Sequence, residues 1–201
     1  MPKTGFTVLE LLIVIGIAAI ITSTVLGNYP EFSRRLAIER EAQLVALALR
    51  EAEERAIRTK RTEAVSEPFN PPYGVHFDLG SGPTDPKRKQ YILFADTDPG
   101  GNTGYYDVGE EIEIMTIGRS VRLKDLCADE KQPPLFTGDC DIDSLSITFR
   151  RPAPLIQVQG VKGGPVMDLG EPDFEIYVET EDMAHTQEIV VWTTGAISIE
   201  N

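Results

Sequence analysis

The stretch FTVLELLIVIGIAAIITSTVL, residues 6–26, decides the architecture of this chain, because its 21 residues contain a single charged side chain, Glu10. As an α-helix with a rise of about 1.5 Å per residue, the stretch is roughly 31 Å long, enough to cross the hydrocarbon core of a bilayer. A secretory signal has a shorter apolar region followed by a small-x-small cleavage site. Residues 21–32, ITSTVLGNYPEF, contain no such site. We therefore expect a membrane helix that stays on the mature protein.

The charge ahead of the apolar run sets its expected orientation. Lys3 is the one basic residue there, and positive charges flanking a membrane helix stay on the cytoplasmic side. The bulk of the chain is therefore expected outside the cytoplasm.

Glu10 is costly within such a helix. A carboxylate at membrane depth costs about 2.5–3.5 kcal/mol on insertion scales and normally has a partner. The run itself contains no Lys or Arg. If the leader MPKTG, residues 1–5, were cut off after Gly5, the new ammonium of Phe6 would lie at the same depth and could neutralise the Glu10 of a neighbouring chain.

These residues resemble a known leader. Residues 3–17, KTGFTVLELLIVIGI, are similar to the prepilin leader of type IV pilins and of type II secretion pseudopilins. In that family a membrane peptidase cuts between the Gly and the Phe and N-methylates the Phe, and the Glu pairs with the N-terminal amine of an adjacent subunit. The resemblance implies that Gly5 and Phe6 form the cleavage and methylation site and that Glu10 acts in assembly.

The resemblance also implies a function. The chain would be a structural subunit, a minor pilin or pseudopilin, of a type IV pilus or a type II secretion pseudopilus. Its implied partners are other pilin or pseudopilin subunits in a helical filament, the prepilin peptidase, the inner-membrane assembly platform and, before assembly, the lipid bilayer. It would be a single-pass protein of the cytoplasmic (inner) membrane and later part of a cell-surface or periplasmic filament. Residues 46–60 and 188–200 are similar to the GspH/FimT branch.

The helix is expected to continue past the apolar run. Many major pilins carry a Pro near position 27, whereas this sequence has Gly27 and then Pro30, so a kink or a break is expected between them. The segment 16–30 either unwinds in a filament or stays helical with a local bend. From Glu31 to about Arg61 an apolar stripe recurs at steps of four and three residues, namely Ile38, Ala42, Val45, Leu49, Ala52 and Ala56. We expect this stripe to pack on the protein's own sheet, with a coiled-coil partner as the alternative.

After Pro68 short alternating runs replace the helical period. They predict strands over residues 73–78, 90–96, 111–117, 144–150, 155–161, 173–179, 188–193 and 196–199. The last two form a hairpin that turns at Thr194-Gly195. The expected fold is α+β, a long N-terminal helix on a mainly antiparallel sheet. The chain then divides into the leader (1–5), the membrane or filament-core helix (6–30), the amphipathic helix (31–66) and an acidic, extracytoplasmic β-rich domain (67–201).

Charge and composition bear on the other function classes. The chain has 32 acidic residues against 19 Lys and Arg, a net charge of -13, which disfavours nucleic acid as a partner. A DNA-binding minor pilin of a competence system remains an alternative, and its only basic clusters are 87–89 and 150–151. We predict no enzymatic activity, because the sequence lacks nucleophile and nucleotide motifs and its two His residues, His76 and His185, are interpreted as surface residues. A membrane-anchored extracytoplasmic enzyme would need a convergent His or carboxylate site.

Two further sites are expected in the β-rich domain. Cys127 and Cys140, the only two Cys, are predicted to form a disulfide in an oxidising compartment. The Gly-rich acidic stretch 96–110 predicts a Ca²⁺ site whose oxygen donors are Asp96, Asp98, Asn102, Asp107 and Glu110, with Glu111 as a substitute for Glu110. Its second half has EF-hand spacing, but its first half is three residues longer. Several pseudopilins resemble this in holding calcium in a loop. The alternative is a solvated acidic turn.

Overall fold

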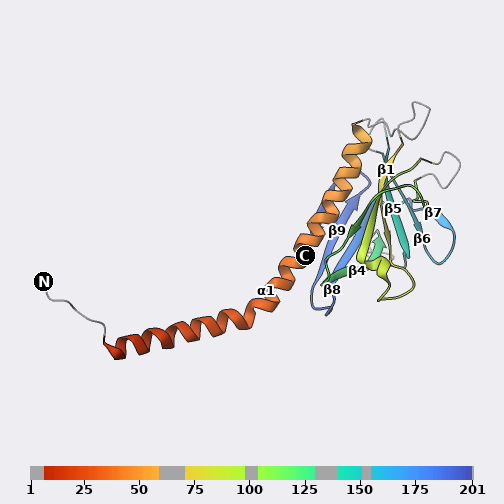
Figure 1. The fold of residues 1–201 in the computed structure, drawn as a ribbon. Coiled ribbons are helices and arrows are strands. Elements are labelled where there is room, and N and C mark those ends of the chain that lie inside the picture. The colour runs from red at the N-terminus through yellow and green to blue at the C-terminus, as the bar shows by residue number, and fades with distance from the viewer. Residues whose placement is uncertain (1–6, 59–70, 98–103, 130–139, 151–154, 201) are drawn as a thin grey trace. The chain divides into compact units, whose positions relative to one another are not determined.

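The computed structural model describes residues 7–58, 71–97, 104–129, 140–150 and 155–200 (Figure 1). The chain divides into two compact units, Met1–Leu36 and Ala37–Asn201. The elements of the described part are α1 (Val8–Ile57), β1 (Tyr73–Asp78), the 3-10 helix η1 (Pro86–Lys89), β2 (Gln90–Ala95), β3 (Glu111–Thr116), β4 (Val121–Ala128), β5 (Ser144–Arg150), β6 (Leu155–Val161), β7 (Val166–Asp168), β8 (Asp173–Thr180), β9 (Thr186–Trp192) and β10 (Ile197–Glu200).

The first unit contains the N-terminal part of α1. The helix is unbroken from Val8 to Ile57 and carries Pro30 in its interior. Of the kink or break predicted between Gly27 and Pro30, the break does not occur, because the helix continues through Pro30. Pro30 removes only one backbone donor, and the turns on either side of it keep their own hydrogen bonds.

The second unit contains the rest of α1, and there the predicted apolar stripe is confirmed. Each of its six residues is buried in the core, together with Ala48. The stripe contacts the domain's own strands in one cluster that also holds Val75, Leu123 and Ile176. The periodicity of 3.6 residues therefore identified the correct face, and this face does not need a coiled-coil partner.

The strands of the second unit form two sheets. One has six strands in the order β3-β2-β1-β5-β6-β7, and the other has four in the order β10-β9-β8-β4. Every pairing between these strands is antiparallel. The α+β class and the antiparallel pairing are confirmed, but two sheets replace the single sheet that the sequence predicted.

Alternation along the strands separates the core from a second face of the larger sheet. On β1, Tyr73, Val75 and Phe77 lie in the core cluster, and so the intervening His76 points to the opposite face. On β5 the core residues are Leu145, Ile147 and Phe149. The side chains of Ser144, Ser146 and Thr148 therefore share the outer face with His76.

Two strands, β4 and β7, were not predicted from the sequence. In β4 the register shifts between Leu123 and Leu126, and all three of Val121, Leu123 and Leu126 are nevertheless fully buried. The inward residues are thus spaced two and then three apart, which hides a strand from a search for strict alternation. β7 has only three residues and pairs along one side with β6. The predicted turn of the last hairpin is confirmed at Gly195, whose φ of 94° suits glycine.

Candidate functional site

The start of α1 positions Glu10, the only charged residue of the apolar run. The hydroxyl of Thr7 accepts a hydrogen bond from the backbone N–H of Glu10 at 3.2 Å, and the carbonyl of Thr7 accepts one from Leu11 at 3.2 Å. Thr7 is thus the N-cap and Glu10 lies in the first helical turn, where the helix dipole favours a carboxylate. The Thr-x-x-Glu spacing is that of a capping box, a signal that the sequence interpretation did not use. Gly5 and Phe6 lie outside the described residues.

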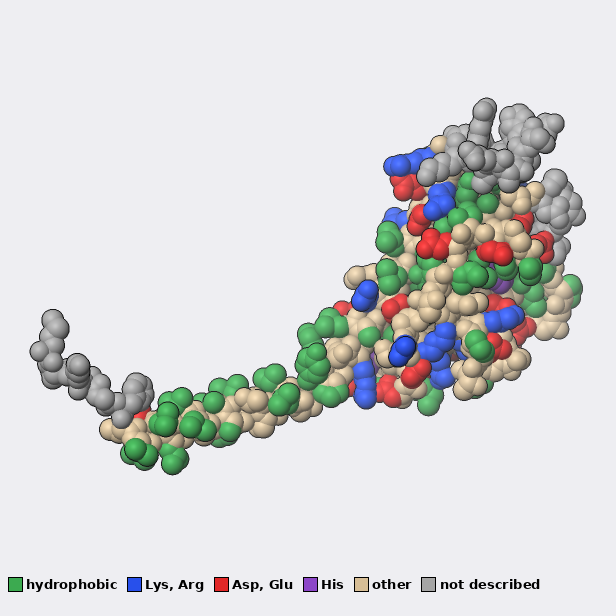
Figure 2. All heavy atoms as spheres, in the orientation of Figure 1, with side chains coloured by type: hydrophobic (Ala, Val, Ile, Leu, Met, Phe, Trp, Pro, Cys, Tyr) green, Lys and Arg blue, Asp and Glu red, His purple; other side chains and the backbone are tan. Residues whose placement is uncertain are grey.

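The apolar side chains of the first unit are exposed. Figure 2 shows hydrophobic side chains along this helix, and 0% of its most apolar 18-residue window is buried within the chain. Between Thr4 and Ser33 there is no Lys or Arg. α1 is therefore long and apolar enough to span a membrane.

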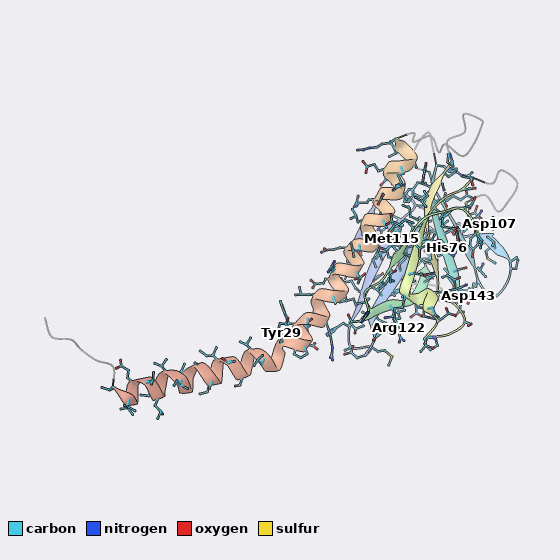
Figure 3. The ribbon with its side chains drawn as sticks, in the orientation of Figure 1. Tyr29, His76, Asp107, Met115, Arg122 and Asp143 are labelled. Carbon is cyan, nitrogen blue, oxygen red and sulfur yellow. A yellow bond between two sulfur atoms is a disulfide. The ribbon has the colours of Figure 1, made fainter. Side chains whose placement is uncertain are left out.

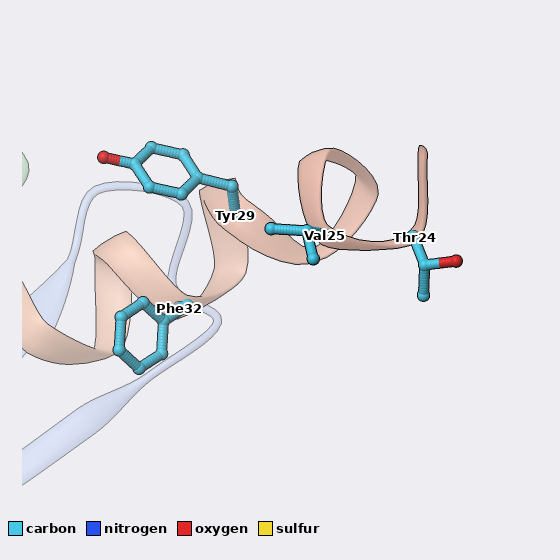
Figure 4. Close-up of a pocket in the computed structure, with 4 residues that line it drawn as sticks. All are labelled: Thr24, Val25, Tyr29 and Phe32. Atoms are coloured by element: carbon cyan, nitrogen blue, oxygen red, sulfur yellow. The ribbon is translucent and has the colours of Figure 1, made fainter. Parts of the chain in front are cut away.

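A hollow on this helix surface is lined by Thr24, Val25, Tyr29 and Phe32 (Figure 4). The Thr24 hydroxyl already donates to the backbone carbonyl of Ile20 at 2.9 Å. The lining brings together no set of charged side chains. It is suited to contact with lipid or with another apolar helix rather than to chemistry.

In the second unit, a loop covers the outer face of the six-stranded sheet. The Tyr105 hydroxyl lies 2.7 Å from the Ser144 hydroxyl, and the backbone N–H of Tyr106 donates to the Ser146 hydroxyl at 3.2 Å. The Thr148 hydroxyl donates to the carbonyl of Gly104 at 2.8 Å. Gly104 has a φ of 98°, a conformation that favours glycine. The alternating polar residues of β5 thus bind this loop instead of facing water.

His76 lies under this loop, so its interpretation as a surface residue is wrong. Its side chain is 4% exposed, and its Nδ1 lies 2.8 Å from the Ser146 hydroxyl. The rings of Tyr105 and Tyr106 lie with their centroids 5.3 Å and 5.0 Å from that of His76, which Figure 3 labels. Burial lowers the pKa of His76 to about 4, opposed by the charge of Asp78. The imidazole is therefore neutral at physiological pH.

The lowered pKa of His76 predicts a loss of stability in acid. The folded-state pKa of about 4 lies below the ordinary histidine pKa of 6.5, which applies in the unfolded chain. The free energy of unfolding is therefore largest above pH 6.5 and falls as the pH drops towards 4. A separation of this size corresponds to about 3 kcal/mol. Urea unfolding of the wild type and of His76→Gln at pH 7 and pH 4 tests this. The wild type should lose about 3 kcal/mol more than the variant between the two pH values, and equal losses would contradict the assignment.

The acidic residues of the predicted calcium loop have internal hydrogen bonds. One oxygen of Asp96 accepts from the Gly104 N–H at 2.8 Å and lies 3.6 Å from the guanidinium of Arg150. The two oxygens of Glu110 accept from the N–H groups of Thr97 at 2.8 Å and Asp107 at 3.1 Å. These carboxylates therefore order the ends of the loop.

The proposed metal donors are only partly described. Asp98 and Asn102 lie outside the described residues, and Glu111, the proposed substitute, accepts from Gly109 at 2.7 Å. Within the described residues no three His, Cys, Asp or Glu side chains are grouped for a metal ion. Burial raises the pKa of Asp96, although the N–H of Gly104 opposes this. The calcium site stays a prediction.

Calcium is predicted to raise the thermal unfolding midpoint of the wild type, because binding to the folded state alone adds to its stability. The matched variant is Asp98→Ala, since Asp96→Ala would also remove the hydrogen bond to Gly104. The wild type should unfold at a higher temperature in millimolar calcium than in chelator, and the variant should show a smaller shift. An equal shift in both proteins, or none in the wild type, would leave only an acidic turn.

The strongest basic cluster, Lys87-Arg88-Lys89, is used inside the second unit. Lys87 pairs with Asp78 at 2.6 Å. The Arg88 guanidinium donates to the carbonyls of Gly82, Leu123 and Lys124, and the Lys89 ammonium donates to those of Arg119 and Val121 and pairs with Glu181. The cluster thus joins η1, which directly precedes β2 of the six-stranded sheet, to β4 of the four-stranded sheet. Of the second cluster, Arg150 lies beside Asp96 and Arg151 is outside the described residues.

The predicted disulfide is confirmed. Cys127, buried on β4, is bonded to Cys140, and their Cα atoms lie 4.0 Å apart. The bond ties the end of β4 to the segment that precedes β5. Closing a loop of this length contributes about 3 kcal/mol in the chain-entropy model.

Comparison of the chain with protein-family models, with curated proteins and with solved structures finds no match.

Proposed function

We propose that this chain is a membrane-anchored structural subunit of a type IV pilin-like filament, a minor pilin or a pseudopilin. The observation that supports it best is the first unit, where an unbroken helix exposes its apolar side chains all round and carries one carboxylate, Glu10, in its first turn. A helix that is apolar on every side needs lipid or other helices around it. The same surface can serve both states, the bilayer before assembly and packed helices afterwards.

Glu10 distinguishes this proposal from a plain membrane anchor. An anchor gains nothing from a carboxylate that costs about 2.5–3.5 kcal/mol at membrane depth. A filament subunit gains a contact that forms only when a neighbouring chain supplies a cation. Since residues 4–33 contain no Lys or Arg, the matching cation is the N-terminal ammonium that cleavage after Gly5 would create.

The second unit is consistent with a location outside the cytoplasm. The disulfide between Cys127 and Cys140 is typical of an oxidising compartment. Lys3 ahead of the helix favours the same orientation.

The two alternative functions have less support. DNA binding would need free basic side chains, whereas Lys87, Arg88 and Lys89 bind Asp78, Glu181 and backbone carbonyls. A hydrolase could use a Ser–His pair, and Ser146 with His76 is such a pair. Ser146 is fully buried beneath Tyr105 and Tyr106, so no substrate can reach its hydroxyl in this arrangement.

Mass spectrometry of the mature protein tests the proposal. We expect a chain that begins at Phe6 with an N-methylated amine, because the leader must leave for the ammonium to form. A form that retains Met1, or one cut beyond Leu26, would contradict membership of a pilin-like filament. Gly5→Leu is the matched variant, and it should accumulate with its leader intact.

A further inference from the structure

The edge strand β3 differs from the other edges of the two sheets in the described part of the chain. β7 and β10 have three and four residues. The outer carbonyls of β4 at Val121, Leu123 and Lys124 accept hydrogen bonds from Lys89 and Arg88. β3 has six residues, five of them exposed, and pairs only with β2. It is therefore the longest edge that the described residues leave open.

The hydrogen-bond pattern shows which backbone groups of β3 face outward. The N–H of Ile117 donates to the carbonyl of Lys89 at 2.8 Å, so these two residues form a hydrogen-bonded pair. Antiparallel pairs alternate between hydrogen-bonded and non-hydrogen-bonded, and Ile114 and Thr116 occupy non-hydrogen-bonded positions opposite Ile92 and Gln90. The N–H and C=O groups of Ile114 and Thr116 thus point away from β2, where a further strand could bind them.

The side chains of β3 alternate in character as well. Glu113 lies on the face of its partner Leu93, while Ile114, which is 52% exposed, lies on the other face beside Ile92. The register shifts between Leu93 and Phe94, so Glu111, opposite Phe94, lies on the face of Ile114 and accepts a hydrogen bond from the Tyr106 hydroxyl. Val108, in the loop just before the strand, is 94% exposed. The strand therefore offers the carboxylate of Glu113 on one face and the apolar side chain of Ile114 on the other.

Charge selects what can pair with this edge. From Gly104 to Gly118 the chain has four acidic residues and no Lys or Arg. A second copy of β3 would bring its own Glu111 and Glu113 to this acidic edge, and like charges brought together across a strand pair destabilise it. The net charge of -13 disfavours other segments of a second copy in the same way.

We propose that β3 binds an extended basic segment of another protein by strand addition. The segment alternates Lys or Arg, on the face of Glu113, with apolar residues, on the face of Ile114. Its backbone bonds to the outward groups of Ile114 and Thr116. This surface lies wholly in the second unit and is independent of assembly through α1.

The test uses the full chain in detergent micelles and a fluorescein-labelled peptide, Lys-Val-Lys-Val-Lys-Val, with Glu-Val-Glu-Val-Glu-Val as its control. Anisotropy should show saturable binding of the first peptide only, weakened at least fivefold by 0.5 M salt because exposed ion pairs are screened. Hydrogen exchange should show protection within residues 111–116. Absence of saturable binding, or protection confined to other strands, would overturn the proposal.

Two pairs of variants separate strand addition from general attraction to an acidic protein. Glu113→Lys should weaken binding at least fivefold, whereas Glu171→Lys, the same charge change on an exposed loop, should not. Ile114→Pro removes an outward N–H and should weaken binding at least tenfold. Ile199→Pro makes the corresponding change on the edge strand β10 and should have no effect. Equal losses within either pair would overturn the proposal. If Ile114→Pro does not fold, the comparison of Glu113→Lys with Glu171→Lys and the hydrogen-exchange protection of residues 111–116 test the proposal.

Discussion

Glu10→Ala is expected to leave the protein processed and inserted in the membrane but absent from filaments. Removing a carboxylate from membrane depth eases insertion by about 2.5–3.5 kcal/mol. The same change leaves the ammonium of a neighbouring Phe6 without its partner, and an uncompensated charge in a low-dielectric environment is strongly destabilising. The effect on assembly should be close to all or none. Membrane fractions and sheared filaments, probed with an antibody against the second unit, measure the two outcomes separately.

The matched control is Glu31→Ala, which removes the other acidic residue of the first unit. Glu31 forms an exposed ion pair with Arg35 at 3.4 Å, four residues along α1, and such pairs contribute little. This variant should assemble normally. Glu10→Ala keeps the hydrogen bond from its backbone N–H to Thr7, so loss of the helix cap cannot account for a defect. Filaments that contain Glu10→Ala at the wild-type level would contradict the assembly role.

The helix was predictable from sequence because its signals are local and periodic. The apolar run 6–26 needs no partner to be recognised, and the steps from Ile38 to Ala56 fit one face of a helix. The sequence predicted a kink or a break at Gly27 to Pro30, and the helix does not break there, because a single missing donor does not outweigh the hydrogen bonds of the flanking turns. Most strand boundaries were also predicted to within two residues, whereas the bulge in β4 disguised that strand.

The arrangement around His76 was not predictable, because the residues that meet there are far apart in sequence. Ser146 is 70 residues from His76, and Tyr106 lies on a separate loop. The alternation of polar Ser144, Ser146 and Thr148 with apolar residues is the usual pattern of a strand with one face in water. Only the folded loop that covers this face explains why these polar side chains are buried.

Leu49→Ala is expected to lower the free energy of unfolding of the second unit by about 2–5 kcal/mol, the range for a fully buried leucine that leaves a cavity. Leu49 is 0% exposed within the apolar stripe and belongs to the core cluster that includes residues of both sheets, while Leu47 on the same helix is 60% exposed. Leu47→Ala is thus the matched control, with an identical change in side chain and helix propensity, and its free energy of unfolding should stay within about 0.5 kcal/mol of the wild type.

Urea unfolding of the full chain in detergent micelles, followed by Trp192 fluorescence, measures the free energy of unfolding of both variants. Equal destabilisation by the two variants would mean that α1 does not pack through this face. A large effect of Leu49→Ala alone would show that the C-terminal part of α1 is held by the core of the second unit.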